Sequence, residues 1–196
     1  HVHAERARAR AAALDARIGE GGDPGPLAGV PFAVKNLFDV EGRVTRAGSR
    51  ATEADAPAAR DAFAIRALEA AGAVLVASTN MDELAYGFSG ENAHDGDTRN
   101  PHDPRLSAGG SSSGSAALVA AGAVPLALGS DTNGSVRVPA ALSGVAGLKP
   151  TYGRLSRAGV YSFVHSLDHV GLFAATADDL SAALAALDGP DPDDPV

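Results

Sequence analysis

The fold is decided by residues 108–151, which read AGGSSSGSAALVAAGAVPLALGSDTNGSVRVPAALSGVAGLKPT. Two clusters of small residues, GGSSSGS at 109–115 and GSDTNGS at 129–135, lie on either side of an almost entirely apolar segment, 116–128. Glycine lets the backbone approach a bound group closely, and its N–H can donate a hydrogen bond with no side chain in the way. We therefore expect the two clusters to form two walls of one active site.

Four segments outside these clusters predict the helices and strands of an α/β domain. Residues 4–18 favour a helix through their Ala, Arg, Leu and Glu content, and residues 58–71 carry apolar side chains at helical spacing. Residues 30–34 (VPFAV) and 73–77 (AVLVA) are short apolar runs that are typical of buried strands. Because helix 58–71 is followed by Gly72 and then by a strand, the order predicts helices layered on a sheet.

The rest of the chain contains five further predicted elements. They are a short helix at 82–86 within a long loop, a helix at 115–121, a strand at 124–128, a helix at 136–143 and a helix at 176–188. Thr176 is the predicted N-cap of the last helix, because Asp178 and Asp179 suit its first turn. A Pro- and Asp-rich tail at 189–196 is expected to be frayed or to act as a linker.

Composition argues against several classes of protein. The 196 residues carry a formal net charge of −8, so the overall charge does not suggest a nucleic-acid surface. Cysteine is absent, which excludes disulfides and a cysteine nucleophile and is compatible with the cytoplasmic location that we expect. The longest apolar run, 116–128, is too short to span a membrane. We therefore expect no direct partner among membranes or nucleic acids.

We expect the sequence to be part of a longer protein. It begins with His1 rather than Met, and it ends in the Pro- and Asp-rich tail. Residues 1–196 are interpreted as one partial domain, because no convincing domain boundary lies within residues 20–188.

A serine nucleophile needs a base, and Lys35 is the candidate. None of the six histidines lies in an apolar setting beside a Gly/Ser cluster, and the G-x-S-x-G and S-x-x-K motifs are absent. Lys35 directly follows the apolar run 30–34, and burial lowers the pKa of a lysine because it disfavours the charged form. The alternative is a surface lysine whose stem is buried at a strand end, which the local sequence alone favours.

A phosphate site is the alternative for the two Gly/Ser clusters, because Gly-rich turns before helices often bind phosphate. Gly109 and Gly114 have the spacing of a Walker A motif, but Ser115 stands where that motif has lysine. The dinucleotide motif G-x-G-x-x-G is also absent. The sequence therefore gives little support to a phosphate site.

The order of motifs resembles that of the amidase signature family of serine hydrolases. The motifs are KNLFDV at 35–40, GGSSSGSAALVAAG at 109–122 and GSDTNGSVRVPAALSGVAGLKPTYG at 129–153. The resemblance runs from about residue 29 to 171 and includes GVPFAVKN, GAVLVASTNMDELAYG, TRNPHDP and SLDHVG. It implies a three-layer α/β/α fold with a mixed β-sheet, of which the C-terminal half is missing from this chain.

The family uses a Ser–cis-Ser–Lys triad, which the motifs carry onto three residues of this sequence. Ser135 matches the nucleophile, Ser111 matches the bridging serine after a cis peptide bond, and Lys35 matches the base. Lys35 would take a proton through the Ser111 hydroxyl, which can accept and donate at once. Ser135 would attack an amide carbonyl, and water would hydrolyse the acyl-enzyme through the same relay. The resemblance thus implies an amidohydrolase with no cofactor and no metal ion.

The second Gly/Ser cluster is expected to bind the oxyanion and the substrate. The residues assigned to this role are Thr132, Asn133 and Gly134, whose backbone N–H groups would act with that of Ser135. Asn133 stands where most family members have Gly. Asn tolerates positive φ, so the turn can be kept, and its amide can reach the substrate. Asp131 is expected to organise the loop through hydrogen bonds.

The substrate class is suggested by one branch of the family. The form DTNGS at 131–135, together with MDELAYGF, TRNPHD and KPTYGRLSRAG, is most similar to the members that hydrolyse 1-carboxybiuret during cyanuric acid breakdown. This branch implies ammonia release from a small carbamoyl amide, a homo- or hetero-oligomer and a small partner subunit. One alternative is the glutaminase (A) subunit of glutamyl-tRNA(Gln) amidotransferase, which usually has DTGGS. Another is an inactive truncated fragment.

Overall fold

A five-stranded mixed sheet forms the centre of the structure, a computed structural model that describes residues 1–194. The strands are β1 (Pro31–Lys35), β2 (Val74–Thr79), β3 (Leu126–Asp131), β4 (Ala146–Leu148) and β5 (His169–Ala174), in the order β2-β1-β3-β5-β4. β1 runs parallel to β2 and β3, whereas β5 runs antiparallel to β3 and β4. Because β1 and β3 are parallel neighbours, Lys35 and Asp131 lie at the same edge of the sheet.

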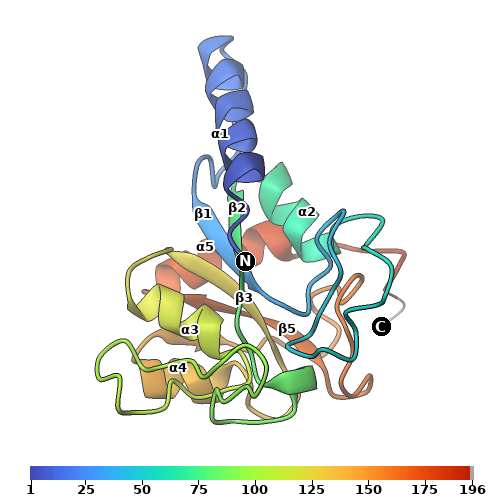
Figure 1. The fold of residues 1–196 in the computed structure, drawn as a ribbon. Coiled ribbons are helices and arrows are strands. Elements are labelled where there is room, and N and C mark those ends of the chain that lie inside the picture. Colours follow the sequence, from blue (N-terminus) through green and yellow to red (C-terminus); the bar gives the residue numbers. More distant parts are fainter. Residues whose placement is uncertain (195–196) are drawn as a thin grey trace.

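Helices cover both faces of this sheet (Figure 1). They are α1 (Ala4–Gly19), α2 (Phe63–Ala70), α3 (Ser113–Ala120), α4 (Arg137–Ser143) and α5 (Ala177–Leu187), with a 3-10 helix η1 (Glu83–Ala85). α3 and α4 pack against a smaller apolar cluster on one face, and α2 and α5 pack against a larger cluster on the other. This arrangement confirms the predicted three-layer α/β/α fold. α1 extends away from the sheet, and Leu14 is its one buried residue.

The alternation of side chains along β1 decides the direction of Lys35. Phe32 and Val34 belong to the larger cluster beneath α2 and α5, whereas Ala33 belongs to the smaller cluster beneath α3 and α4. Successive side chains of a strand point to opposite faces, so Lys35 shares the face of Ala33. The strand therefore directs its only charged residue toward the segment that precedes α3.

Three elements differ from the prediction in ways that bear on the site. β5 has no counterpart among the predicted elements. β3 extends to Asp131 instead of ending at residue 128, so Ser130 is a strand residue. α2 begins at Phe63 instead of residue 58, because the preceding residues form a loop in which the N–H of Ala62 donates to the distant carbonyl of Asp39.

The tail after α5 is held by side-chain contacts over the residues that the structure describes. Ser156 Oγ donates to Asp191 at 2.5 Å, and Arg60 pairs with Asp193 at 2.7 Å. The prediction of a frayed tail therefore does not hold for residues 189–194, while residues 195–196 lie outside the described part. Within residues 1–194, no helix combines the length and apolar character that crossing a membrane requires.

Candidate active site

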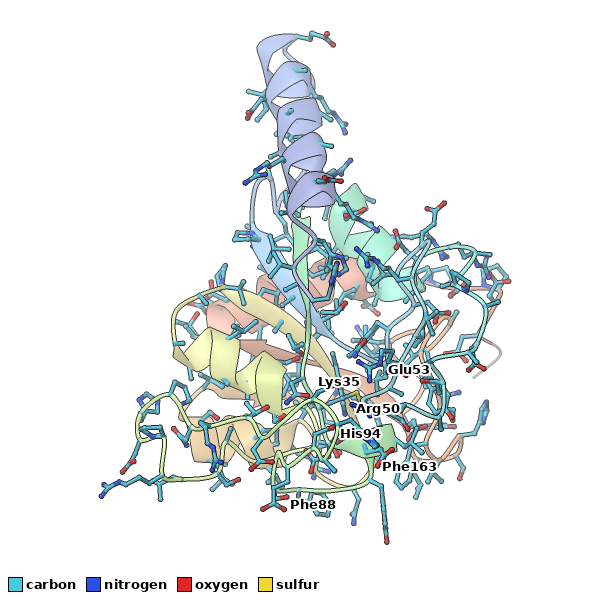
Figure 2. The ribbon with its side chains drawn as sticks, viewed as in Figure 1. Lys35, Arg50, Glu53, Phe88, His94 and Phe163 are labelled. Carbon is cyan, nitrogen blue, oxygen red and sulfur yellow. The ribbon has the colours of Figure 1, made fainter. Side chains whose placement is uncertain are left out.

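Lys35, which Figure 2 labels, ends β1 and contacts two buried serines. Its Nζ lies 2.7 Å from Ser111 Oγ and 2.9 Å from Ser130 Oγ, and the side chain is fully buried. The alternative of a surface lysine is therefore wrong. Ser130 was missed from the sequence, because the predicted strand ended before it and nothing local indicates a contact with a residue so distant along the chain.

Burial determines the protonation of Lys35. Loss of solvation lowers its pKa to about 7 from an ordinary value of 10.5, because the charged form is disfavoured. Three carboxylates, those of Asp82, Asp131 and Asp168, oppose this shift through their negative charges. A substantial neutral fraction is therefore present near pH 7, and a neutral lysine can accept a proton.

The segment that carries Ser111 is tied directly to the second cluster. The Gly110–Ser111 peptide bond is cis, and Ser111 and Ser112 are fully buried. The N–H of Ser112 donates to the carbonyl of Ser135 at 3.2 Å. Ser112 Oγ also donates to the carbonyl of Ser130 at 3.2 Å and accepts from the N–H of Ser130 at 3.3 Å. The structure thus brings Lys35, Ser111 and the Ser135 loop together.

Asp131 organises the loop that carries Ser135, as the sequence predicts. Its fully buried carboxylate accepts from the N–H of Gly134 at 2.7 Å and from the N–H of Val136 at 3.2 Å. Arg137 donates to both of its oxygens, at 3.0 Å and 2.9 Å. Burial acts to raise the pKa of Asp131, but the hydrogen bonds from Arg137 and the backbone outweigh it and hold the pKa below its usual value.

Two expectations for this loop need correction. The N–H of Gly134 donates to Asp131 Oδ1, so it serves the loop itself and not an oxyanion. The left-handed conformation falls on Gly134, at φ 133°, and not on Asn133, so the turn does not depend on the tolerance of Asn for positive φ. Thr132 and Asn133 keep their predicted place beside Ser135, because all three line one cavity.

This cavity, of about 330 Å³, lies at Ser135 and has an aromatic side and a polar side. Its lining residues are Ala85, Tyr86, Gly87, Phe88, Thr132, Asn133, Ser135 and Phe163. The rings of Tyr86 and Phe163 are 5.7 Å apart, and Phe88 and Phe163 both lie below Lys35 in Figure 2. None of the lining side chains is charged. Sequence reasoning missed the three aromatic residues, because they lie in loops without periodicity.

The arrangement has the parts that a serine hydrolase needs. A buried base contacts a hydroxyl that can relay a proton, and a second serine lies beside a cavity with polar and aromatic walls. Among residues 1–194, no three His, Asp or Glu side chains gather closely enough to hold a metal ion.

Known proteins match the chain along its whole length. The family model for amidases matches residues 1–196. The AtzE component of 1-carboxybiuret hydrolase from Pseudomonas sp. (strain ADP) is 60% identical over 191 residues, which cover 97% of this chain and 42% of that protein. The glutamyl-tRNA(Gln) amidotransferase (A) subunit of Halorhodospira halophila (strain DSM 244 / SL1) is 52% identical over 190 residues, which cover 97% of this chain and 39% of that protein. The chain therefore spans about two fifths of the length of these relatives.

Solved structures have the same fold. One of them, from work on a vestigial protein complex and the origins of an s-triazine catabolic enzyme, superimposes with a TM-score of 0.98 at 59% identity. That match covers 100% of this chain and 43% of the other. The native peptide amidase of Stenotrophomonas maltophilia gives a TM-score of 0.91 at 41% identity, covering 96% of this chain and 39% of the other. The family resemblance read from the motifs is confirmed, and the chain belongs to the amidase family.

Proposed function

We propose that the protein carrying this chain hydrolyses a small amide, with Ser135 as the nucleophile and Lys35 as the base that acts through Ser111. The observation that carries this proposal is the 2.7 Å contact between Lys35 Nζ and Ser111 Oγ, in a buried site where the pKa of Lys35 is about 7. Membership of the amidase family supports the same chemistry.

The proposed reaction proceeds in two halves. Neutral Lys35 accepts a proton from Ser111 while Ser111 accepts one from Ser135, and the Ser135 oxygen attacks the amide carbon. Backbone N–H groups near Thr132 and Asn133 stabilise the oxyanion. The relay then protonates the leaving nitrogen, the C–N bond breaks and an ester to Ser135 remains. Water attacks this ester through the same relay and releases the carboxylic acid.

For the substrate, we favour a carbamoyl compound similar to 1-carboxybiuret, with release of ammonia. The 60% identity to a 1-carboxybiuret hydrolase subunit supports this choice. The uncharged cavity at Ser135 suits a neutral carbamoyl end, while a carboxylate at the other end of such a substrate extends away from it. Asn133, at the polar side, has an amide that matches the hydrogen-bonding groups of a carbamoyl compound.

The second candidate is the glutaminase (A) subunit of a glutamyl-tRNA(Gln) amidotransferase. The 52% identity over 190 residues to such a subunit favours it. Both candidates lead us to propose a small partner subunit in a cytoplasmic assembly, since the relatives named above are subunits and one solved structure comes from a protein complex. A further alternative is that residues 1–196 on their own are an inactive fragment, because they span about two fifths of the length of these relatives.

Ammonia release by the protein at its full natural length tests the proposal. We expect the highest kcat/KM on 1-carboxybiuret and lower values on biuret, malonamate and glutamine. Ser135→Ala should reduce ammonia release to the background rate, and Ser181→Ala, at an exposed position of α5 outside the cavity, should retain it. A preference for glutamine would favour the amidotransferase candidate. Activity that persists in Ser135→Ala would refute the mechanism.

A further inference from the structure

A buried carboxylate in the SLDHVG motif joins two parts of the cavity lining. Asp168 is 8% exposed. Its Oδ1 accepts from Thr132 Oγ1 at 2.5 Å, and its Oδ2 accepts from the N–H of Phe163 at 2.8 Å. Oδ2 also accepts from the N–H of Val164 at 2.9 Å and from Ser162 Oγ at 3.0 Å. One oxygen therefore holds the loop before Ser135, and the other holds the turn at residues 162–164.

Two of the residues that Asp168 binds, Thr132 and Phe163, line the cavity at Ser135. Thr132 is on its polar side, next to the backbone N–H groups proposed for the oxyanion. Phe163 is on its aromatic side, where its ring faces that of Tyr86. Since one carboxylate binds both segments, a displacement of Phe163 moves the group to which Thr132 is bonded.

Phe163 also lies between this cavity and a second, smaller one. The second cavity has a volume of about 150 Å³, and its lining includes Ser130, Ser162, Phe163, Asp168 and His169. Ser130 is the residue whose hydroxyl contacts Lys35. The turn that Asp168 holds thus borders the nucleophile on one side and the partner of the base on the other. A loose turn would let water reach both, which weakens electrostatic interactions inside the site.

We propose that Asp168 is a positioning residue that couples the aromatic side of the substrate cavity to the oxyanion loop. A substrate that packs against Phe163 holds the turn at 162–164 in place. Through Asp168 the turn holds Thr132, and with it the neighbouring N–H donors. This inference rests on the proposed amide hydrolysis. It adds that the selection of a substrate at Phe163 and the stabilisation of its transition state depend on one carboxylate.

Thr132→Val breaks the bridge without touching the carboxylate or the aromatic side. We expect it to lower kcat by roughly 10-fold to 100-fold, because small misplacements of catalytic groups have effects of this size. Thr132→Ser keeps the hydroxyl and should restore kcat to near the wild-type value. Thr176→Val is the matched control, since Thr176 Oγ1 also donates to an aspartate, Asp179, at 2.6 Å but lies at the start of α5, outside both cavities. It should leave kcat unchanged.

A double-mutant cycle with Phe163→Leu measures the coupling itself. In the wild-type background we expect Phe163→Leu to lower kcat/KM by about 5-fold, the effect of losing an aromatic contact. In the Thr132→Val background we expect less than about a 2-fold loss, because the bridge is already broken. In the Thr176→Val background the loss should again be about 5-fold. The measurements use the full-length protein and the best substrate of the ammonia assay.

Several outcomes would overturn the inference. Additive effects of Thr132→Val and Phe163→Leu would show that the two sides act independently. Failure of Thr132→Ser to restore kcat would assign the effect to loop stability instead. If Thr132→Val does not fold, Thr132→Ala replaces it, because it removes the same hydroxyl. That variant should also abolish the coupling, and additive effects with Phe163→Leu would contradict the bridge. Ser135→Ala is measured alongside, because its activity tests the proposed function separately.

Discussion

The protonation state of Lys35 results from two opposing effects on its pKa. Burial removes water from the ammonium group and lowers its pKa, whereas nearby carboxylates favour the charged form. The contacts with Ser111 and Ser130 fix the position of Nζ, so the base is held in place as well as tuned. This balance leads to a specific dependence on pH.

The kcat/KM for amide hydrolysis should rise with pH and level off above about pH 8. Only neutral Lys35 accepts a proton, and its pKa in the folded protein is about 7, so the neutral form grows as pH passes through 7. Below about pH 6 the slope should approach tenfold per pH unit. A pH–rate profile checks this. Lys35→Arg, whose guanidinium stays protonated, should be inactive throughout, and a flat profile in the wild type would contradict the role of Lys35.

Ser130→Ala should lower the kcat plateau by about tenfold, because Lys35 Nζ loses one of its two fixed contacts. It should also move the midpoint of the pH–rate profile to lower pH. The lost hydroxyl accepts from the ammonium form, so its removal disfavours the charged state. Ser181→Ala, at an exposed position of α5, is the control outside the cluster. An unchanged plateau with an unchanged midpoint would mean that Ser130 only fills space.

At the scale of elements, the segment before α3 that carries Gly110 and Ser111 is packed against the buried carboxylate of Asp82. A Cβ placed on Gly110 would lie 2.2 Å from Asp82 Oδ1, which no side chain tolerates. The N–H of Asp82 donates to the carbonyl of Ser111 at 3.3 Å, and its carboxylate accepts from the N–H of Gly90 at 3.0 Å. The MDELAYG motif therefore supports the segment that carries Ser111.

Gly110→Ala should lower the free energy of unfolding by about 1–3 kcal/mol, because the new methyl group has to displace Asp82. It should also lower kcat, since the displaced segment carries Ser111. Denaturant unfolding and steady-state kinetics measure the two effects. Gly19→Ala, at the end of α1 where a Cβ meets nothing within 4 Å, is the matched control and should not destabilise the protein. Equal effects of the two substitutions would refute the packing argument.

Local patterns predicted the elements better than they predicted the contacts. The Thr176 cap of α5 follows from residues next to one another in sequence, and the structure confirms it with a bond from the N–H of Asp179. β5 was missed, because HVGLFA is short and the residues on either side of it give no clear strand signal. The pairing of Lys35 with Ser130 joins positions 95 residues apart, which periodicity cannot indicate. Lys35 was first singled out by its position after the apolar run 30–34, whereas Ser111 was identified through the family resemblance alone.

At the scale of the molecule, the site forms where three distant segments meet at one edge of the sheet. β1 supplies Lys35, the segment before α3 supplies Ser111, and the loop after β3 supplies Ser135. The loop at residues 152–168 borders the cavity through Phe163. This loop is itself held by the residues that follow α5, so the geometry of the site depends on contacts far from Ser135.

Arg157 is the main link between that loop and the residues after α5. Its guanidinium pairs with Asp194 at 3.3 Å and donates to the carbonyl of His165, and both side chains of the pair are 9% exposed.

Arg157→Ala should therefore lower the free energy of unfolding by about 2 kcal/mol, because it removes this cation from beside a buried carboxylate. Arg105→Ala removes an Arg–Asp pair that lies in the solvent and should leave unfolding unchanged. Urea unfolding of both variants, each checked for KM on the best substrate, distinguishes the two cases. Arg157→Ala should raise KM as well, because Phe163 loses its support. Equal stability of the two variants with an unchanged KM would show that the cavity does not depend on this link.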